Sequence, residues 1–124
     1  MTDAEVVLQA LTGSERERLD GLEVFAEIES TNSYLLEQPA PRPGHFRVTI
    51  ADHQTAGRGR QGKRWISPPS SGLALSLSFT FEETPANLPS LTLAAGIGIA
   101  AALQTIGVND IGLKWPNDIV AQDG

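Results

Sequence analysis

The stretch from Leu73 to Phe81 reads LALSLSFTF, and it carries the clearest strand signal in the chain. Apolar and polar residues alternate strictly along it, which is the period of an extended strand. The leucines and phenylalanines at 75, 77, 79 and 81 therefore share one face, and Ser76, Ser78 and Thr80 share the other. We predict a strand with one apolar and one polar face.

Outward from this strand, the same reasoning predicts further strands and helices along the chain. The predicted strands are Leu22 to Ile28, Phe46 to Ala51, Ile111 to Trp115 and Ile119 to Gln122, the last two paired around Pro116-Asn117. The predicted helices are Ala4 to Leu11, a segment capped by Ser30 or Thr31 that runs through Glu37, and Asn87 to Ile106, followed by Gly107. With strands in hairpins and helices between them, this order predicts an α+β fold with a mixed, mostly antiparallel sheet and helices on one face.

Composition narrows the class of protein. The chain has 124 residues, a length that suits one domain, and 40% of them are hydrophobic, which argues against disorder. The net charge of −6 argues against a general nucleic-acid binder, and the absence of cysteine excludes disulfides and thiol catalysis. The apolar run Leu91 to Leu103 is too short to span a bilayer, and the acidic N-terminus lacks the basic start of a signal peptide. We expect a soluble, cytoplasmic protein.

A basic, glycine-spaced loop stands out against this acidic background: GRGRQGKRW, Gly57 to Trp65. It satisfies both G-x-G-x-x-G and G-x-x-x-x-G-K, but Pro68-Pro69 prevents the helix that both phosphate motifs need. The P-loop also needs Ser or Thr where Arg64 stands. The plainer alternative is a solvated basic loop, yet such loops rarely contain tryptophan. We therefore predict a loop that orders over a small anionic ligand, such as a nucleotide.

Three motifs together resemble the biotin–protein ligases, also called biotin–acetyl-CoA-carboxylase ligases or holocarboxylase synthetases. They are ESTN (Glu29 to Asn32), QTAGRGRQGKRW (Gln54 to Trp65) and KWPND (Lys114 to Asp118). The resemblance implies the biotin/lipoate ligase fold, which is like that of class II aminoacyl-tRNA synthetases. It also implies an enzyme that uses ATP and Mg²⁺ to form biotinyl-5′-AMP and passes biotin to a lysine of a carboxyl-carrier domain. Residues 22–124 would then be the N-terminal portion of the catalytic domain, and residues 1–21 a short helix and lead-in.

The resemblance carries residue roles onto this chain where the motifs match. Biotin contacts are implied for Ser30, Thr31, Asn32, Gln54, Arg58, Gly59 and Arg60. Nucleotide contacts are implied for Arg60, Trp65, Lys114, Asn117 and Asp118. Arg58, Arg60 and Asp118 are the implied catalytic residues, and Asp118 is the candidate Mg²⁺ ligand. Gln61 departs from the family, which usually carries a cation there. Helix capping by Ser30 and a simple turn at 116–118 are the structural alternatives for two of these segments.

Two departures from the family bear on activity and partners. Fewer residues precede the first strand than a winged helix-turn-helix needs, so no DNA binding is expected. The chain ends at Gly124, where the family's catalytic lysine would follow, so we expect a truncated ligase with uncertain activity alone. An unpaired sheet edge would favour a homodimer or a strand-exchanged assembly. The alternatives are a lipoate-type ligase, a non-catalytic biotin- or nucleotide-binding fragment, and a single-stranded nucleic-acid binder.

Overall fold

The computed structural model describes residues 2–57, 72–108, 111–114 and 118–121, and for the last two ranges it describes the backbone alone. The chain divides into two compact units, Met1–Glu82 and Glu83–Gly124, and each is described by itself. The first unit contains the three-stranded sheet that positions the candidate site. The second contains one long helix and a strand pair.

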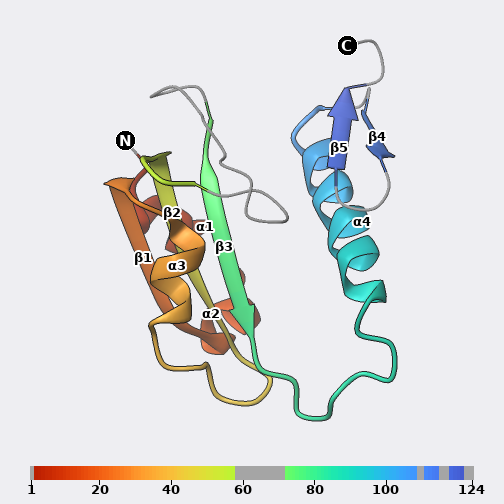
Figure 1. The fold of residues 1–124 in the computed structure, drawn as a ribbon, viewed down its shortest axis with the longest axis horizontal. Coiled ribbons are helices and arrows are strands. Elements are labelled where there is room, and N and C mark those ends of the chain that lie inside the picture. The colour runs from red at the N-terminus through yellow and green to blue at the C-terminus, as the bar shows by residue number, and fades with distance from the viewer. Residues whose placement is uncertain (1, 58–71, 109–110, 115–117, 122–124) are drawn as a thin grey trace. The chain divides into compact units, whose positions relative to one another are not determined.

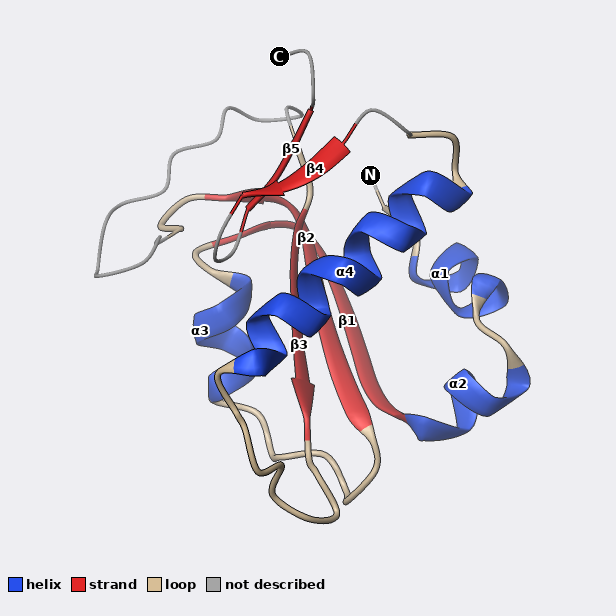
Figure 2. Ribbon diagram, turned by 90° about the vertical axis from the view of Figure 1, so that its right-hand side faces the viewer, coloured by secondary structure: helices blue, strands red, loops and turns tan. Residues whose placement is uncertain are grey.

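The first unit is built on the strands β1 (Leu19–Ile28), β2 (Phe46–Gln54) and β3 (Ala74–Phe79), in that spatial order (Figure 2). β2 and β3 are antiparallel, whereas β1 and β2 are parallel. The expectation of hairpins throughout is wrong for this first pair. Parallel neighbours need a crossover connection, and here the helix α3 (Thr31–Leu36) and the loop after it provide one. The predicted mixed sheet is confirmed.

The register of the strands separates an apolar face from a polar one. Val48 lies opposite Leu22 on one side and Leu77 on the other, so these apolar residues share a face. Thr49 lies between Glu23 and Ser76 in the same way, on the opposite face. The alternation predicted for β3 therefore extends to these neighbours in β1 and β2, with Phe25 an apolar exception on the polar face. The strand prediction for residues 73–81 was two residues too long at its C-terminal end.

Helices lie on both faces of this sheet (Figure 1), so the prediction of helices on one face is wrong. α3 contacts β2 and β3 on the polar face, while α1 (Ala4–Ala10) and α2 (Gly13–Arg18) contact β1. Val7 and Leu11 join the apolar side chains of the sheet around a groove of about 400 Å³. The fold thus has a groove on one face and α3 on the other.

The predicted helix Ala4 to Leu11 is confirmed as α1, but the sequence analysis missed α2. Thr12 is the N-cap of α2: its side chain accepts a hydrogen bond from the Glu15 N–H at 3.1 Å. The Glu15 carboxylate in turn accepts from the Thr12 N–H at 2.8 Å, which completes a capping box. Leu11, the C-cap of α1, and Thr12, the N-cap of α2, are therefore all that separates the two helices.

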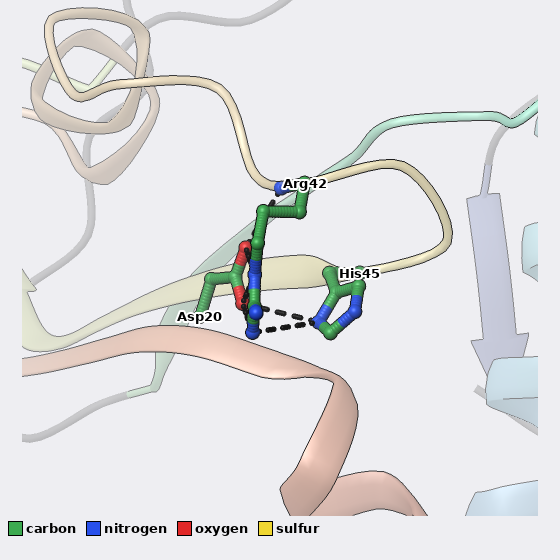
Figure 3. Close-up of polar contacts among 3 residues, drawn as sticks. All are labelled: Asp20, Arg42 and His45. Atoms are coloured by element: carbon green, nitrogen blue, oxygen red, sulfur yellow. Dashed lines mark hydrogen bonds and ion pairs between the residues drawn. The ribbon is translucent and has the colours of Figure 1, made fainter.

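Three polar residues join the segments at the starts of β1 and β2 (Figure 3). Asp20 accepts hydrogen bonds from the Arg42 side chain at 2.8 and 3.1 Å and from its backbone N–H at 2.7 Å. His45 Nδ1 lies 3.1 Å from the same carboxylate. Next to it, Gly44 has φ 79°, which favours glycine, and donates to the Thr80 carbonyl at 2.8 Å. The loop before β2 is thus tied to β1 and to the end of β3.

Acid should weaken this link in a defined pH range. The hydrogen bonds from Arg42 hold the pKa of Asp20 at about 2, below its ordinary 3.8. Because the pKa is lowered by folding, this stabilisation is complete above the unfolded value and is lost as the pH falls toward 2. Asp20→Asn should therefore flatten the dependence of the free energy of unfolding on pH between about 4 and 2. Urea unfolding followed by circular dichroism measures that slope. Arg42→Ala should flatten it too, and wild-type slopes in both variants would contradict the assignment.

The second unit begins with α4 (Ser90–Thr105), shorter at its start than the predicted Asn87–Ile106. Gly107, at φ 99°, follows it as predicted; its N–H bonds the Gln104 carbonyl, and Val108 bonds Leu103. The predicted strand pair is confirmed as the antiparallel strands β4 (Ile111–Lys114) and β5 (Asp118–Ala121). Within the described ranges, no helix combines the length and apolar character that crossing a bilayer demands.

Candidate functional site

Two of the quoted motifs meet at one edge of the sheet. Because β1 and β2 are parallel, the residues that follow them emerge at the same edge. The pairing even continues past the strands: the Thr55 N–H donates to the Ile28 carbonyl at 3.0 Å, and the Ala56 N–H donates to Glu29 at 2.8 Å. This ladder places the start of the arginine-containing loop directly beside the segment Glu29 to Asn32.

Ser30 and Thr31 are held in place by the start of α3. The Ser30 hydroxyl accepts a hydrogen bond from the Ser33 N–H at 3.2 Å, so the predicted N-cap is confirmed. Both residues are buried, with exposed fractions of 7% for Ser30 and 3% for Thr31. Capping therefore explains Ser30, but it does not explain why the Thr31 side chain is buried as well.

Thr31 is the centre of a polar network that joins three elements. Gln54, at the end of β2, accepts through Oε1 from the Thr31 backbone N–H at 2.8 Å and lies 3.1 Å from the Thr31 hydroxyl. The Thr31 hydroxyl is also 2.8 Å from the hydroxyl of Ser76 on β3. The network thus joins residues that are 23 and 45 positions from Thr31 in the chain. Sequence analysis missed Ser76, although the serines on the polar face of its strand were a usable signal.

The chemistry of this network is that of an uncharged hydrogen-bonding surface. Thr31, Gln54 and Ser76 provide hydroxyl and amide groups and no ionisable group. Such groups suit a neutral polar ligand group, since a charged one would need a partner of opposite sign. The structure therefore brings together three uncharged side chains, and two of them belong to the predicted biotin site.

The other predicted site residues fall into three groups. Asn32 is exposed, and the network of Thr31, Gln54 and Ser76 does not include it. Arg58, Gly59, Arg60, Trp65 and Asn117 lie outside the described residues. Lys114 and Asp118 are register partners across β4 and β5, so their backbones lie opposite each other, and their side chains are not described.

The described residues contain no group of three or more His, Asp or Glu side chains arranged to hold a metal ion. The candidate Mg²⁺ ligand, Asp118, has a described backbone only.

The chain is similar in sequence to curated proteins of two kinds. The chain is 40% identical over 111 residues to the bifunctional ligase/repressor BirA of Escherichia coli. The aligned region covers 86% of this chain and 33% of that protein. It is 38% identical over 108 residues to the biotin–[acetyl-CoA-carboxylase] ligase of Mycobacterium tuberculosis, and the match covers 83% of this chain and 41% of that protein. The chain thus spans between a third and about two fifths of the length of these relatives.

The fold is also found in solved structures, of which two are described here. One is the biotin acetyl coenzyme A carboxylase synthetase of Helicobacter pylori with bound biotinylated ATP, at a TM-score of 0.69 and 29% identity; the match covers 83% of this chain and 50% of that one. The other is the biotin protein ligase of Aquifex aeolicus in complex with biotin and ATP, at a TM-score of 0.61 and 35% identity. That match covers 81% of this chain and 41% of the Aquifex chain. The expected ligase fold is confirmed. Residues 24–124 match the model of the biotin/lipoate A/B protein ligase family, and the chain belongs to that family.

Proposed function

We propose that this chain binds biotin beside the Thr31–Gln54–Ser76 network and serves ATP-dependent biotin–protein ligation. The observation that carries the proposal is the pair of hydrogen bonds, 2.8 and 3.1 Å, by which Gln54 joins two family motifs into one site. The ureido ring of biotin is a neutral group of donors and acceptors, which suits this uncharged surface. The Helicobacter and Aquifex structures, with bound biotinylated ATP and with biotin and ATP, support the same choice of ligands.

The proposed reaction has two steps. A carboxylate oxygen of biotin attacks the α-phosphorus of ATP, the new O–P bond forms, and pyrophosphate leaves. The amine of a carrier lysine then attacks the acyl carbon of biotinyl-5′-AMP, loses a proton, and AMP leaves as the amide forms. Both reactants of the first step are negative, so Arg58 and Arg60 are proposed to neutralise their repulsion, with Gly59 allowing the backbone to approach.

The nucleotide side of the site is proposed from the resemblance alone. Trp65 would pack beside the adenine, and Lys114, Asn117 and Asp118 would contact the rest of the nucleotide. The register pairing of Lys114 with Asp118 is consistent with a shared role but does not define one. Mg²⁺ as the metal, the carrier domain as acceptor, a homodimer and a cytoplasmic location stay predictions.

Ligand binding by the chain itself tests the proposal. We expect biotin to bind and to raise the melting temperature, because a ligand that binds only the folded state stabilises it. Isothermal titration calorimetry with biotin, and separately with lipoate, measures this directly. Binding of lipoate in preference to biotin would favour the lipoate-type alternative. No binding of biotin at about 1 mM, the upper end of ordinary substrate constants, would overturn the proposal.

A second measurement separates an enzyme from a binding module. After biotin binding is established, ATP and Mg²⁺ are added and biotinyl-5′-AMP is sought by mass spectrometry. Formation of the adenylate supports the ligase reaction. Tight binding of biotin without any adenylate would instead support the non-catalytic binding fragment.

A further inference from the structure

The side chain of Arg47 crosses from β2 to β1 on the polar face of the sheet. Arg47 is the register partner of Gly21, and its Nη2 bonds Oε1 of Glu23, two residues further along β1, at 3.1 Å. A Cβ atom at residue 21 would lie only 2.6 Å from Nη2 and 2.7 Å from Cζ of Arg47, closer than real Cβ atoms approach other atoms. Gly21 therefore leaves the space in which the guanidinium lies against β1.

Three polar atoms around this ion pair are buried. They are Glu23 Oε2, Arg47 Nε and Thr49 Oγ1, and no described residue forms a hydrogen bond with any of them. Thr49 is fully buried, and the side chains of Arg47 and Glu23 are only 16% and 25% exposed. A buried polar atom without a partner is destabilising, so such atoms in folded proteins generally bond either protein or ordered water.

The register of the strands brings the three atoms into one small region. Glu23 and Thr49 are opposite each other on strands that lie about 4.8 Å apart, and Arg47 is two residues from Thr49 on the same face. The bond from Arg47 to Glu23 holds those two side chains together. A water molecule with hydrogen bonds of ordinary length bridges polar atoms about 4–5.5 Å apart, a spacing that suits side chains on neighbouring strands.

We propose that Glu23, Arg47 and Thr49 bind one internal water molecule beneath the ion pair. Arg47 Nε can only donate, so the water accepts there, and the carboxylate oxygen Glu23 Oε2 only accepts, so the water donates there. The Thr49 hydroxyl can do either and completes a set of three partners, the usual number for buried water. None of these residues belongs to the three motifs, so the inference is independent of the proposed function.

The alternative is an ion pair that closes on itself. Arg47 Nε would then bond Glu23 Oε2 directly, and two of the three buried atoms would be satisfied without water. That arrangement gives no partner to the hydroxyl of Thr49, which is fully buried. Thr49 is therefore the residue that favours a bound water over a closed ion pair, and it separates the two by experiment.

Thr49→Val replaces the hydroxyl by a methyl group with little change of shape. Loss of a hydroxyl that bonds water should lower the folding equilibrium constant about 5-fold, whereas loss of an unbonded buried hydroxyl should raise it. Urea denaturation followed by circular dichroism measures the change. Thr55→Val, at an exposed position just after β2, makes the same substitution and should leave the constant unchanged. An unchanged or raised constant in Thr49→Val would overturn the inference.

Gly21→Ala tests the position of the guanidinium. Alanine normally stabilises a strand relative to glycine, yet here the new methyl group would displace Arg47 from β1 and break the water site. We therefore expect a lower urea midpoint. In an Arg47→Ala background the same substitution should raise the midpoint, because no side chain then occupies the space. A raised midpoint in the chain that keeps Arg47 would contradict the geometry on which the inference depends.

A crystal structure of the chain observes the water directly. We expect an ordered water about 2.7–3.2 Å from all three atoms, Glu23 Oε2, Arg47 Nε and Thr49 Oγ1. A direct bond between Arg47 Nε and Glu23 Oε2 with no water beside Thr49 would refute the proposal. Biotin need not be bound for this measurement, so its result does not depend on whether the chain is a ligase.

Discussion

Leu35→Ala should lower the free energy of unfolding by about 2–5 kcal/mol, the cost typical of deleting a buried leucine side chain. Leu35 is only 7% exposed, and it lies on α3 where the helix contacts the sheet. The neighbouring Leu36 is 76% exposed, so Leu36→Ala should change stability by less than about 0.5 kcal/mol. Urea denaturation followed by circular dichroism measures both.

The two variants can be compared directly because both remove the same type of side chain from the same helix. Helix propensity changes equally at both positions, so the difference reports burial alone. Leu35→Ala should also weaken biotin binding, since α3 holds Thr31 in the network. Equal destabilisation by the two variants would show that α3 is not packed on the sheet as described.

Arg60→Ala should weaken binding of a non-hydrolysable biotinyl-5′-AMP analogue by about 100-fold. The proposed reason is that the guanidinium faces the charge at the junction of carboxylate and phosphate. Binding of biotin methyl ester, which lacks that charge, should change much less. Arg60→Lys should fall between, because it keeps the charge and loses the two-pronged geometry of arginine. Calorimetry with the two ligands measures the split.

Arg18→Ala is the matched control for this prediction. Arg18 is exposed at the end of α2, and its loss changes the net charge of the chain by the same amount. If both variants weaken binding of the analogue equally, the effect comes from the overall charge of the chain. If Arg60→Ala weakens binding of biotin methyl ester as much as binding of the analogue, the role proposed for Arg60 at the charged junction is wrong.

Much of the local structure was predictable because it depends on neighbouring residues. Strict alternation located β3, and a serine before a short apolar segment located the start of α3. Signals from neighbouring residues can also be ambiguous. Thr12 can end a helix or begin one, and only the reciprocal bonds with Glu15 show that it begins α2. β2 extends past the predicted Ala51 to Gln54, because pairing with β1 carries the strand three residues further.

Capping, alternation and motifs are properties of nearby residues, so they were enough to predict most of the helices and strands, the family and the short segments that contain the candidate site. The folded chain alone shows that β1 and β2 run parallel, which brings Thr31 and Gln54 to one edge. It also shows that Ser76, 45 positions from Thr31, completes their network. Contacts of this kind depend on the order and register of strands, which pair by backbone hydrogen bonds that every residue except proline can make.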